Sequence, residues 1–186
     1  MPMDKGADSY RRFLDGDRDA MVEIIRDYKD GLMMYLYRFT NDINTAEELT
    51  EDTFFRLYTK RPRFSPKHSF KTWLYTIGRN LTLNHLRKQK WISGSSIDEC
   101  THIAAPSDIE IEYIKKEQNL ELYRTLDKLK PDYRQVLNLA NIEGFSTDET
   151  ARIMRKSHRQ IGNLLYRAKK ALREQLGKEG STYEKL

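Results

Sequence analysis

The chain is poor in the features that mark secreted and membrane proteins. Its 186 residues include a single cysteine, Cys100, so no disulfide can form within the chain. No run approaches the roughly 20 apolar residues that a membrane span requires, and the sequence does not open with an apolar segment and a cleavage signal. We therefore expect a cytoplasmic protein without direct membrane insertion.

Chain-breaking residues and catalytic patterns are scarce as well. There are nine glycines and five prolines, and apolar residues recur three or four positions apart instead of alternating. This predicts an all-α fold, with a length that suits one ordinary domain or two small ones. Because the sequence has no clustered carboxylates, metal-ligand spacing, phosphate-binding glycine loop or nucleophile–base pair, we predict no catalytic residue, no metal site and no cofactor.

Charge is abundant, and in one segment it is almost all positive. The net charge of +5 is modest, so the clustering, more than the sum, indicates a polyanionic partner. Segment 146–176 predicts two helices and a turn, each helix opened by a capping box, Ser146 with Glu149 and Ser157 with Gln160. A merely solvated face would mix charge signs, so the segment favours a DNA-binding helix-turn-helix. The second helix has an apolar stripe at Ile161, Leu164, Leu165, Ala168, Leu172 and Leu176, opposite Arg159, Asn163, Arg167, Lys170 and Arg173.

A second region combines aromatic, amide and basic residues. An acidic helix is expected from Thr45, where Glu48 would complete a capping box. Its acidic half indicates either placement at the helix dipole or a docking surface for a basic partner, and the residues alone leave both open. A basic loop over 61–69 and a helix over 70–91 follow. Rings that stack on bases and cations that meet phosphates suit single-stranded nucleic acid. Beside its buried stripe, the 70–91 helix carries a second stripe of residues spaced three or four positions apart: Trp73, Thr76, Asn80, Asn84 and Arg87.

The organisation of the chain follows from one break in periodicity. Residues 92–107 are slightly acidic and contain serine, glycine and proline, which predicts a flexible linker. The chain then divides into two small helical domains, 1–91 and 108–186. Further helices are expected over 7–15, over 18–40, from Asp108 to about Leu126, and over 131–142, where Pro131 suits a first helical position.

Both domains resemble a known family. The run AEELTEDTFFRLYTKRPRFSPKHSFKTWLYTIGRNLTLNHLRKQK (46–90) is similar to region 2 of bacterial sigma factors, and the pattern FxTWLYxIxRN at 70–80 is highly specific. The run from Leu126 to Glu174 is similar to region 4. Together they look most like the extracytoplasmic-function (ECF) group of the sigma-70 family. The resemblance implies a protein that binds core RNA polymerase through its beta and beta-prime subunits, directs it to promoter DNA and helps open the duplex. It also implies an anti-sigma factor as a partner.

The resemblance assigns roles to three sets of residues. Its core-polymerase contact falls on Leu49, Glu51, Asp52, Phe55 and Arg56. Its −10 region, where a flipped base of the non-template strand is held, falls on Phe64, Lys67, His68, Trp73, Tyr75, Arg79, Asn80 and Asn84, with His68 expected as a loop donor. Its −35 reader falls on Arg155, Lys156, Ser157, Arg159, Gln160, Asn163 and Arg167. Arg159, Gln160 and Asn163 are placed for base edges, while Arg155, Lys156 and Arg167 suit phosphates.

The chain also departs from the family. The family usually has glycine where Arg155 stands and an apolar residue where Lys156 stands. It commonly has basic residues at Gly162 and Leu164. Two other classes of protein compete with a sigma factor. A stand-alone helix-turn-helix repressor or activator explains 126–176 but not 61–90, and a nucleic-acid enzyme lacks the patterns of an active site.

Overall fold

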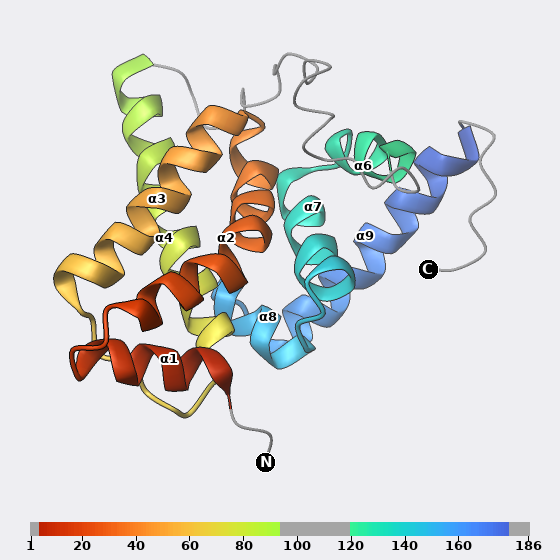
Figure 1. Ribbon diagram of the computed structural model, residues 1–186. Helices are drawn as coiled ribbons and strands as arrows, with labels where there is room; N and C mark the ends of the chain where they lie inside the picture. The colour runs from red at the N-terminus through yellow and green to blue at the C-terminus, as the bar shows by residue number, and fades with distance from the viewer. Residues whose placement is uncertain (1–3, 94–119, 179–186) are drawn as a thin grey trace. The chain divides into compact units, whose positions relative to one another are not determined.

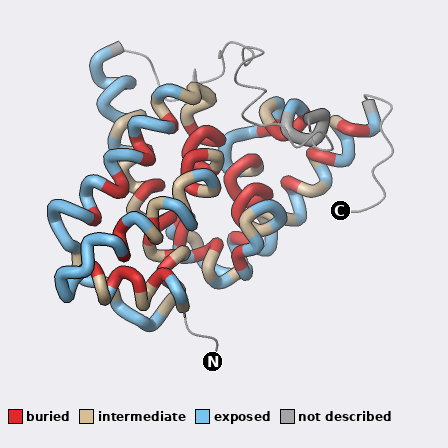
Figure 2. The backbone as a smooth tube through the Cα atoms, in the orientation of Figure 1, coloured by how far each residue is buried: buried red, intermediate tan, exposed pale blue. Residues whose placement is uncertain are grey.

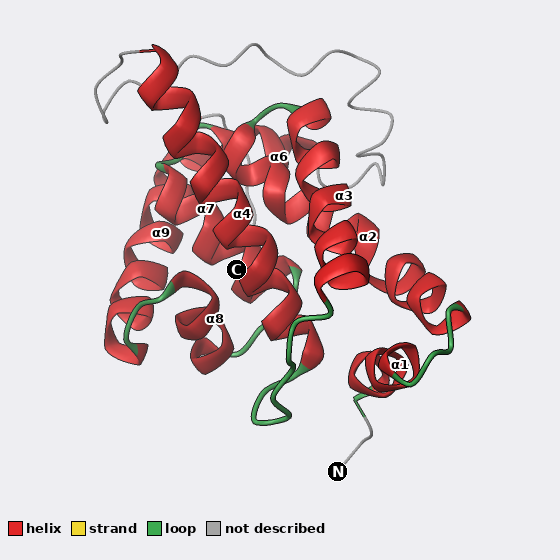
Figure 3. Ribbon diagram, turned by 90° about the vertical axis from the view of Figure 1, so that its left-hand side faces the viewer, coloured by secondary structure: helices red, strands yellow, loops and turns green. Residues whose placement is uncertain are grey.

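The computed structural model describes residues 4–93 and 120–178, which fall in two units divided between His102 and Ile103 (Figure 1). Throughout these residues the chain forms helices joined by short loops, without a strand (Figure 3). The all-α prediction is therefore confirmed for this part of the chain. Most of the predicted linker, Cys100, the start of the helix expected from Asp108, and the last eight residues lie outside the described ranges.

Residues 4–93, the described part of the first unit, form four helices. They are α1 (Lys5–Leu14), α2 (Asp19–Thr40), α3 (Ile43–Lys60) and α4 (Phe70–Ser93), and α2 packs against each of the other three. The core between them includes Leu32, Leu36, Leu57, Phe70 and Leu74, all buried (Figure 2). Because apolar residues are spaced three or four positions apart along these helices, each helix has one apolar face that packs into the core.

The start of α3 differs from the expected capping box at Thr45 and Glu48, and that prediction is wrong. The N-cap is Asp42, whose carboxylate accepts a hydrogen bond from the Thr45 amide at 3.1 Å. The reason is the backbone just before it: Asn41 closes α2 in a left-handed conformation and Asp42 is extended, so the chain is ready to turn into a helix three residues earlier than predicted.

The second unit holds the expected helix-turn-helix. Its elements are α6 (Leu120–Asp127), α7 (Pro131–Leu137), a π-helical turn η1 (Asn138–Ile142), α8 (Thr147–Met154) and α9 (His158–Lys178). Pro131 lies at the start of α7 as predicted, and Gly144, with φ +72°, follows the end of η1. The helices α6, α7 and α8 all pack against α9.

Candidate nucleic-acid interface

Helices α8 and α9 each begin in a capping box, both predicted from sequence, and the second box lies at the turn between them. The Ser146 Oγ accepts from the Glu149 amide at 3.3 Å, and Glu149 Oε2 accepts from the Ser146 amide at 2.9 Å. At the start of α9, Ser157 Oγ accepts from the Gln160 amide at 3.2 Å while Gln160 Oε1 accepts from the Ser157 amide at 2.7 Å. Ser157 and Gln160 are therefore first of all capping residues, which fix where α9 begins.

Two further contacts hold the turn. His158 Nδ1 lies 2.7 Å from Asp148 Oδ1, which joins the start of α9 to the first turn of α8. Lys156 Nζ lies 3.2 Å from Asp132 Oδ2 on α7. That ion pair partly neutralises Lys156, one of the predicted phosphate contacts, and directs its ammonium group toward α7.

Arg155 occupies the turn in a conformation that suits glycine. It ends α8 with φ 54° and ψ 45°, in the left-handed region, and its side chain is exposed. For a residue with a Cβ, this region costs roughly 1–2 kcal/mol. The structure thus shows why glycine suits this position, and it leaves the arginine side chain projecting from the turn.

Helix α9 presents one buried and one exposed face. Ile161, Ala168, Leu172 and Leu176 are buried, whereas Leu164 and Leu165 are only half-buried. The sequence reasoning missed Tyr166, whose side chain is 73% exposed. Its spacing could have revealed it, because it lies three residues after Asn163 and seven after Arg159. The exposed face comprises Arg159, Gly162, Asn163, Tyr166, Arg167, Lys170 and Arg173.

In the first unit, the 61–69 loop lies over an aromatic cluster. The ring of Phe64 is half-buried, with its centroid 5.8 Å from that of Phe70 and 5.3 Å from that of Trp73. The ring of Tyr10, on α1, lies 5.2 Å from Trp73. Lys67 is exposed and His68 half-buried in the same loop. The loop therefore combines a packed aromatic floor with exposed positive charge.

Helix α1 ties down both ends of this loop. Tyr10 Oη donates a hydrogen bond to the Pro62 carbonyl at 2.7 Å. The Asp4 carboxylate accepts from the Phe70 amide at 2.6 Å and from the Ala7 amide at 3.1 Å, so it caps α4 and α1 together. Burial raises the pKa of Tyr10 to about 12, against the opposing effect of the Arg61 charge.

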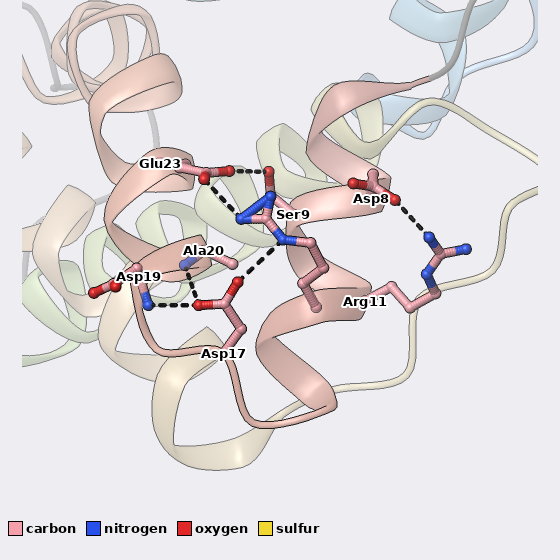
Figure 4. A network of polar contacts seen from close by, with 8 residues as sticks. Asp8, Ser9, Arg11, Asp17, Asp19, Ala20 and Glu23 are labelled. Carbon is pink, nitrogen blue, oxygen red and sulfur yellow. Dashed lines mark hydrogen bonds and ion pairs between the residues drawn. The ribbon is translucent and has the colours of Figure 1, made fainter.

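Helix α1 is itself held on α2 by a polar network (Figure 4). The Arg12 guanidinium contacts Glu23 at 2.6 Å and Asp17 at 3.1 Å. The Ser9 hydroxyl donates to the other Glu23 oxygen at 2.8 Å. Because these contacts fix α1 on α2, its hydrogen bonds to Pro62 and Phe70 set the position of the loop relative to the helices.

A cleft of about 480 Å³ opens between α1 and the loop. Its lining includes the half-buried ring of Phe64, the edge of the buried Tyr10, the charged side chains of Asp8 and Arg63, and Pro66 on the loop side. The cleft is therefore a mixed surface, with one accessible aromatic ring among side chains of both charge signs.

The outward face of α4 carries some of the predicted −10 residues but not all. Trp73 and Asn80 are half-buried and Asn84 is exposed. Tyr75, however, is 1% exposed and stacks on Tyr35 with ring centroids 5.3 Å apart. Direct contact of Tyr75 with DNA is incompatible with this burial, so it supports the core instead.

Arg79 also lies inside. It is 8% exposed, its guanidinium carbon lies 5.9 Å from the centroid of the Phe39 ring, and its charge acts on the buried Tyr35 phenol. Burial raises the pKa of Tyr35, an effect that the Arg79 charge opposes. The predicted DNA contact for Arg79 is therefore replaced by a role in the core, where aromatic rings and a phenol accommodate its charge.

A third surface lies between α2 and α3. A groove of about 390 Å³ is lined by apolar side chains that include Met21, Ile25 and Phe54, with Glu51 on its rim. Phe55 and Tyr58, at 66% and 46% exposure, also line it. Asp52 and Arg56 are exposed outside the groove lining, whereas Leu49 is only 3% exposed. Leu49 thus belongs to the core, and a direct contact with a partner is excluded for it.

No described helix is both long and apolar enough to cross a membrane. Within the same residues, no group of three or more histidine, cysteine or carboxylate side chains is arranged to hold a metal ion.

The two units are those of a transcription initiation factor. Residues 24–92 match the family model for sigma-70 region 2, and residues 119–172 match that for sigma-70 region 4. The chain belongs to the ECF group of sigma-70 family sigma factors. It is therefore a sigma factor, which directs RNA polymerase to promoters, and sigma factors are generally not enzymes.

Individual relatives agree with this assignment. The chain is 30% identical to the ECF sigma factor SigW of Bacillus subtilis, over 87% of this chain and 91% of SigW. It is 30% identical to BldN of Streptomyces coelicolor, over 84% of this chain but only 60% of BldN. Among solved structures, the sigma factor RpoE in complex with the anti-sigma factor NepR from Bartonella quintana has a similar fold. That likeness has a TM-score of 0.66, with 23% identity over 83% of this chain and 95% of RpoE.

Proposed function

We propose that the chain binds the polymerase and the promoter through three separate surfaces. The domain of residues 1–91 binds core polymerase and holds the −10 element, the domain of residues 108–186 reads the −35 element, and the acidic segment 92–107 connects them. The observation that carries this proposal is the pairing of a one-signed basic face on α9 with an aromatic, basic loop over 61–69. A stand-alone repressor needs the first of these features but not the second.

The polymerase contact falls on the α2–α3 groove. Glu51 and Phe55 line it, and Asp52 and Arg56 extend the exposed charge beside it. An exposed phenylalanine next to an apolar groove is the kind of anchor that dominates protein interfaces. Phe55→Ala should therefore weaken core binding at least tenfold. Val22→Ala is a matched control, because Val22, on α2, is an exposed apolar residue like Phe55 on α3 but does not line the groove.

The −10 contact falls on the loop and the outward face of α4. Phe64, Lys67, His68, Trp73, Asn80 and Asn84 stay as proposed contacts, and the cleft between α1 and the loop is the proposed pocket for the flipped base. Asn80 and Asn84 are four residues apart on α4, with Asn80 half-buried and Asn84 exposed, so both offer amide groups on one face.

The −35 contact falls on α9 and its turn. Arg159 and Asn163 are proposed for base edges and Arg155 and Arg167 for phosphates. Ser157 and Gln160 contribute chiefly by setting the start of the helix. Lys156 contributes less, because its charge is paired with Asp132.

The proposal extends to partners and place of action. Because RpoE is seen bound to an anti-sigma factor, we infer that an anti-sigma factor also holds this chain inactive by covering its polymerase surface. The chain acts in the cytoplasm, where core polymerase meets DNA, and it performs no catalysis of its own.

The test is reconstitution with core polymerase. The chain plus core should yield promoter-specific transcripts and open the duplex, whereas the chain alone should not. Asn80→Ala should reduce promoter opening while core binding is kept, and Gln89→Ala, exposed at the far end of α4, should leave both unchanged. Specific binding by the chain alone, without any polymerase-dependent transcript, would support the repressor instead.

A further inference from the structure

Gly162 is out of place by the physics of the chain alone. It lies inside α9, its backbone is not in the left-handed region, and a Cβ built on it meets nothing within 4 Å. Neither a turn nor close packing requires a glycine here. Glycine inside a helix costs about 1 kcal/mol relative to alanine. Contacts within the chain therefore do not compensate this cost, and we look for the compensating interaction in a binding partner.

Tyr166 lies one helical turn away on the same exposed face. Residues four apart on a helix are surface neighbours, so the bare backbone at Gly162 and the ring of Tyr166 form one continuous surface. The ring is 73% exposed although it is large and mostly apolar. Arg159 precedes this notch by one turn, and Arg167 and Lys170 follow it. The notch is thus an apolar patch inside a basic face.

The basic residues around the notch suit a polyanion, and the proposed function of α9 makes that polyanion duplex DNA. A helix of this kind lies in the major groove, where base edges offer hydrogen-bond donors, acceptors and a single apolar group, the 5-methyl group of thymine. Arg159 and Asn163 suit the polar groups. The notch, with a backbone Cα and an aromatic ring, suits the methyl group.

We propose that Gly162 and Tyr166 together read the 5-methyl group of one thymine in the −35 element. Gly162 provides the space that lets the base edge approach the helix, and the Tyr166 ring packs against the methyl group. This inference rests on the proposed function of α9 as the −35 reader.

The test removes the methyl group alone. The chain with core polymerase first selects a promoter duplex from a randomised pool, and each thymine of its −35 element is then replaced in turn by deoxyuridine. Loss of one buried methyl contact should weaken binding about fourfold at one position. Deoxyuridine in the spacer between the two elements is the control and should have no effect.

The variants separate the two residues. Tyr166→Ala should bind the thymine and uracil duplexes equally, whereas Tyr166→Phe should keep the preference because the ring remains. Gly162→Leu should fill the notch and abolish the preference, and folding is expected to persist because the position is open. The inference is overturned if uracil has no effect at any −35 position, if Tyr166→Ala or Gly162→Leu retains the preference, or if Tyr166→Phe loses it.

A failure of this inference differs from a failure of the proposed function. If scrambling the whole −35 element leaves binding unchanged, α9 does not read it and the proposed function fails. If binding depends on the −35 element but not on any thymine methyl group, only the role of Gly162 and Tyr166 is refuted.

Discussion

At the turn of the helix-turn-helix, the backbone conformation of Arg155 should lower stability while its charge should favour DNA binding. The substitution Arg155→Gly should separate these two effects. With φ 54° and ψ 45°, the residue closes α8 in the left-handed region. Relief of that conformation is worth roughly 1–2 kcal/mol, less roughly 0.5–1 kcal/mol for the greater freedom of glycine in the unfolded chain. At mid-range the net gain is roughly 0.75 kcal/mol, which for a domain of this size raises the melting temperature by roughly 3–6 °C.

The same change should weaken promoter binding. If the Arg155 guanidinium contacts a phosphate, its loss lowers affinity for all sequences alike and reduces the slope of log K against log salt by about one. Arg155→Ala is the matched control, because it removes the same charge but keeps a Cβ in the left-handed region. It should lose as much affinity as Arg155→Gly and gain no stability.

Two assays decide the question: thermal unfolding of the full chain followed by circular dichroism, and binding of the reconstituted holoenzyme to promoter DNA across a salt series. Equal melting temperatures for Arg155→Gly and Arg155→Ala would refute the strain argument. Undiminished affinity in both variants would refute the phosphate contact and leave the arginine without a compensating role at this turn.

Three further predictions concern the supports of the proposed site. Ser146→Ala breaks the capping box of α8 and should destabilise the second unit by about 1 kcal/mol, measured by urea unfolding, and an unchanged unfolding midpoint would contradict this role of the cap. Asp4→Ala leaves the Phe70 and Ala7 amides without their carboxylate and should cost about 1–2 kcal/mol together with slower promoter opening; unchanged opening would show that the cap is not needed for the loop. The pKa of Tyr10, raised to about 12 in the folded chain, means that the unfolded chain loses this proton first, so stability should fall as pH rises from about 10 toward 12. Tyr10→Phe should make the fall in the free energy of unfolding between about pH 10 and about pH 12 shallower. If the slope of the free energy of unfolding against pH is unchanged in this variant, the fall is due to other groups.

The two faces of α9 were predictable because the signal is local. Apolar residues at helical spacing lie on the side of the helix opposite Arg159, Asn163 and Arg167. Both capping boxes use partners three residues apart. Nothing beyond the helix itself is needed to decide which side is buried. The capping error at α3 is also local: Asp42 and Thr45 are competing signals three residues apart, and the left-handed Asn41 decides in favour of Asp42.

The burial of Tyr75 and Arg79 was not predictable in this way. Helix α4 packs against both α2 and α3, so its buried arc is wider than the stripe that Phe70 and Leu74 define. Arg79 has the charge of a surface residue, and only the presence of Tyr35 and Phe39 on another helix makes its burial tolerable. Positions carried over from a family resemblance carry no information about such contacts.

Helix α1 shows why the proposed −10 contact cannot be understood from the matched region 2, residues 24–92, alone. That region begins at Ile24, so α1 lies before it. Yet Asp4 caps the helix that starts at Phe70, and Tyr10 holds the carbonyl of Pro62. Both ends of the 61–69 loop are thus bonded to a helix that is itself fixed to α2 through Arg12. Since a loop fixed at both ends loses less conformational entropy when it binds, the readiness of this loop to hold a base depends on α1, although α1 carries none of the residues that the family resemblance assigns to DNA.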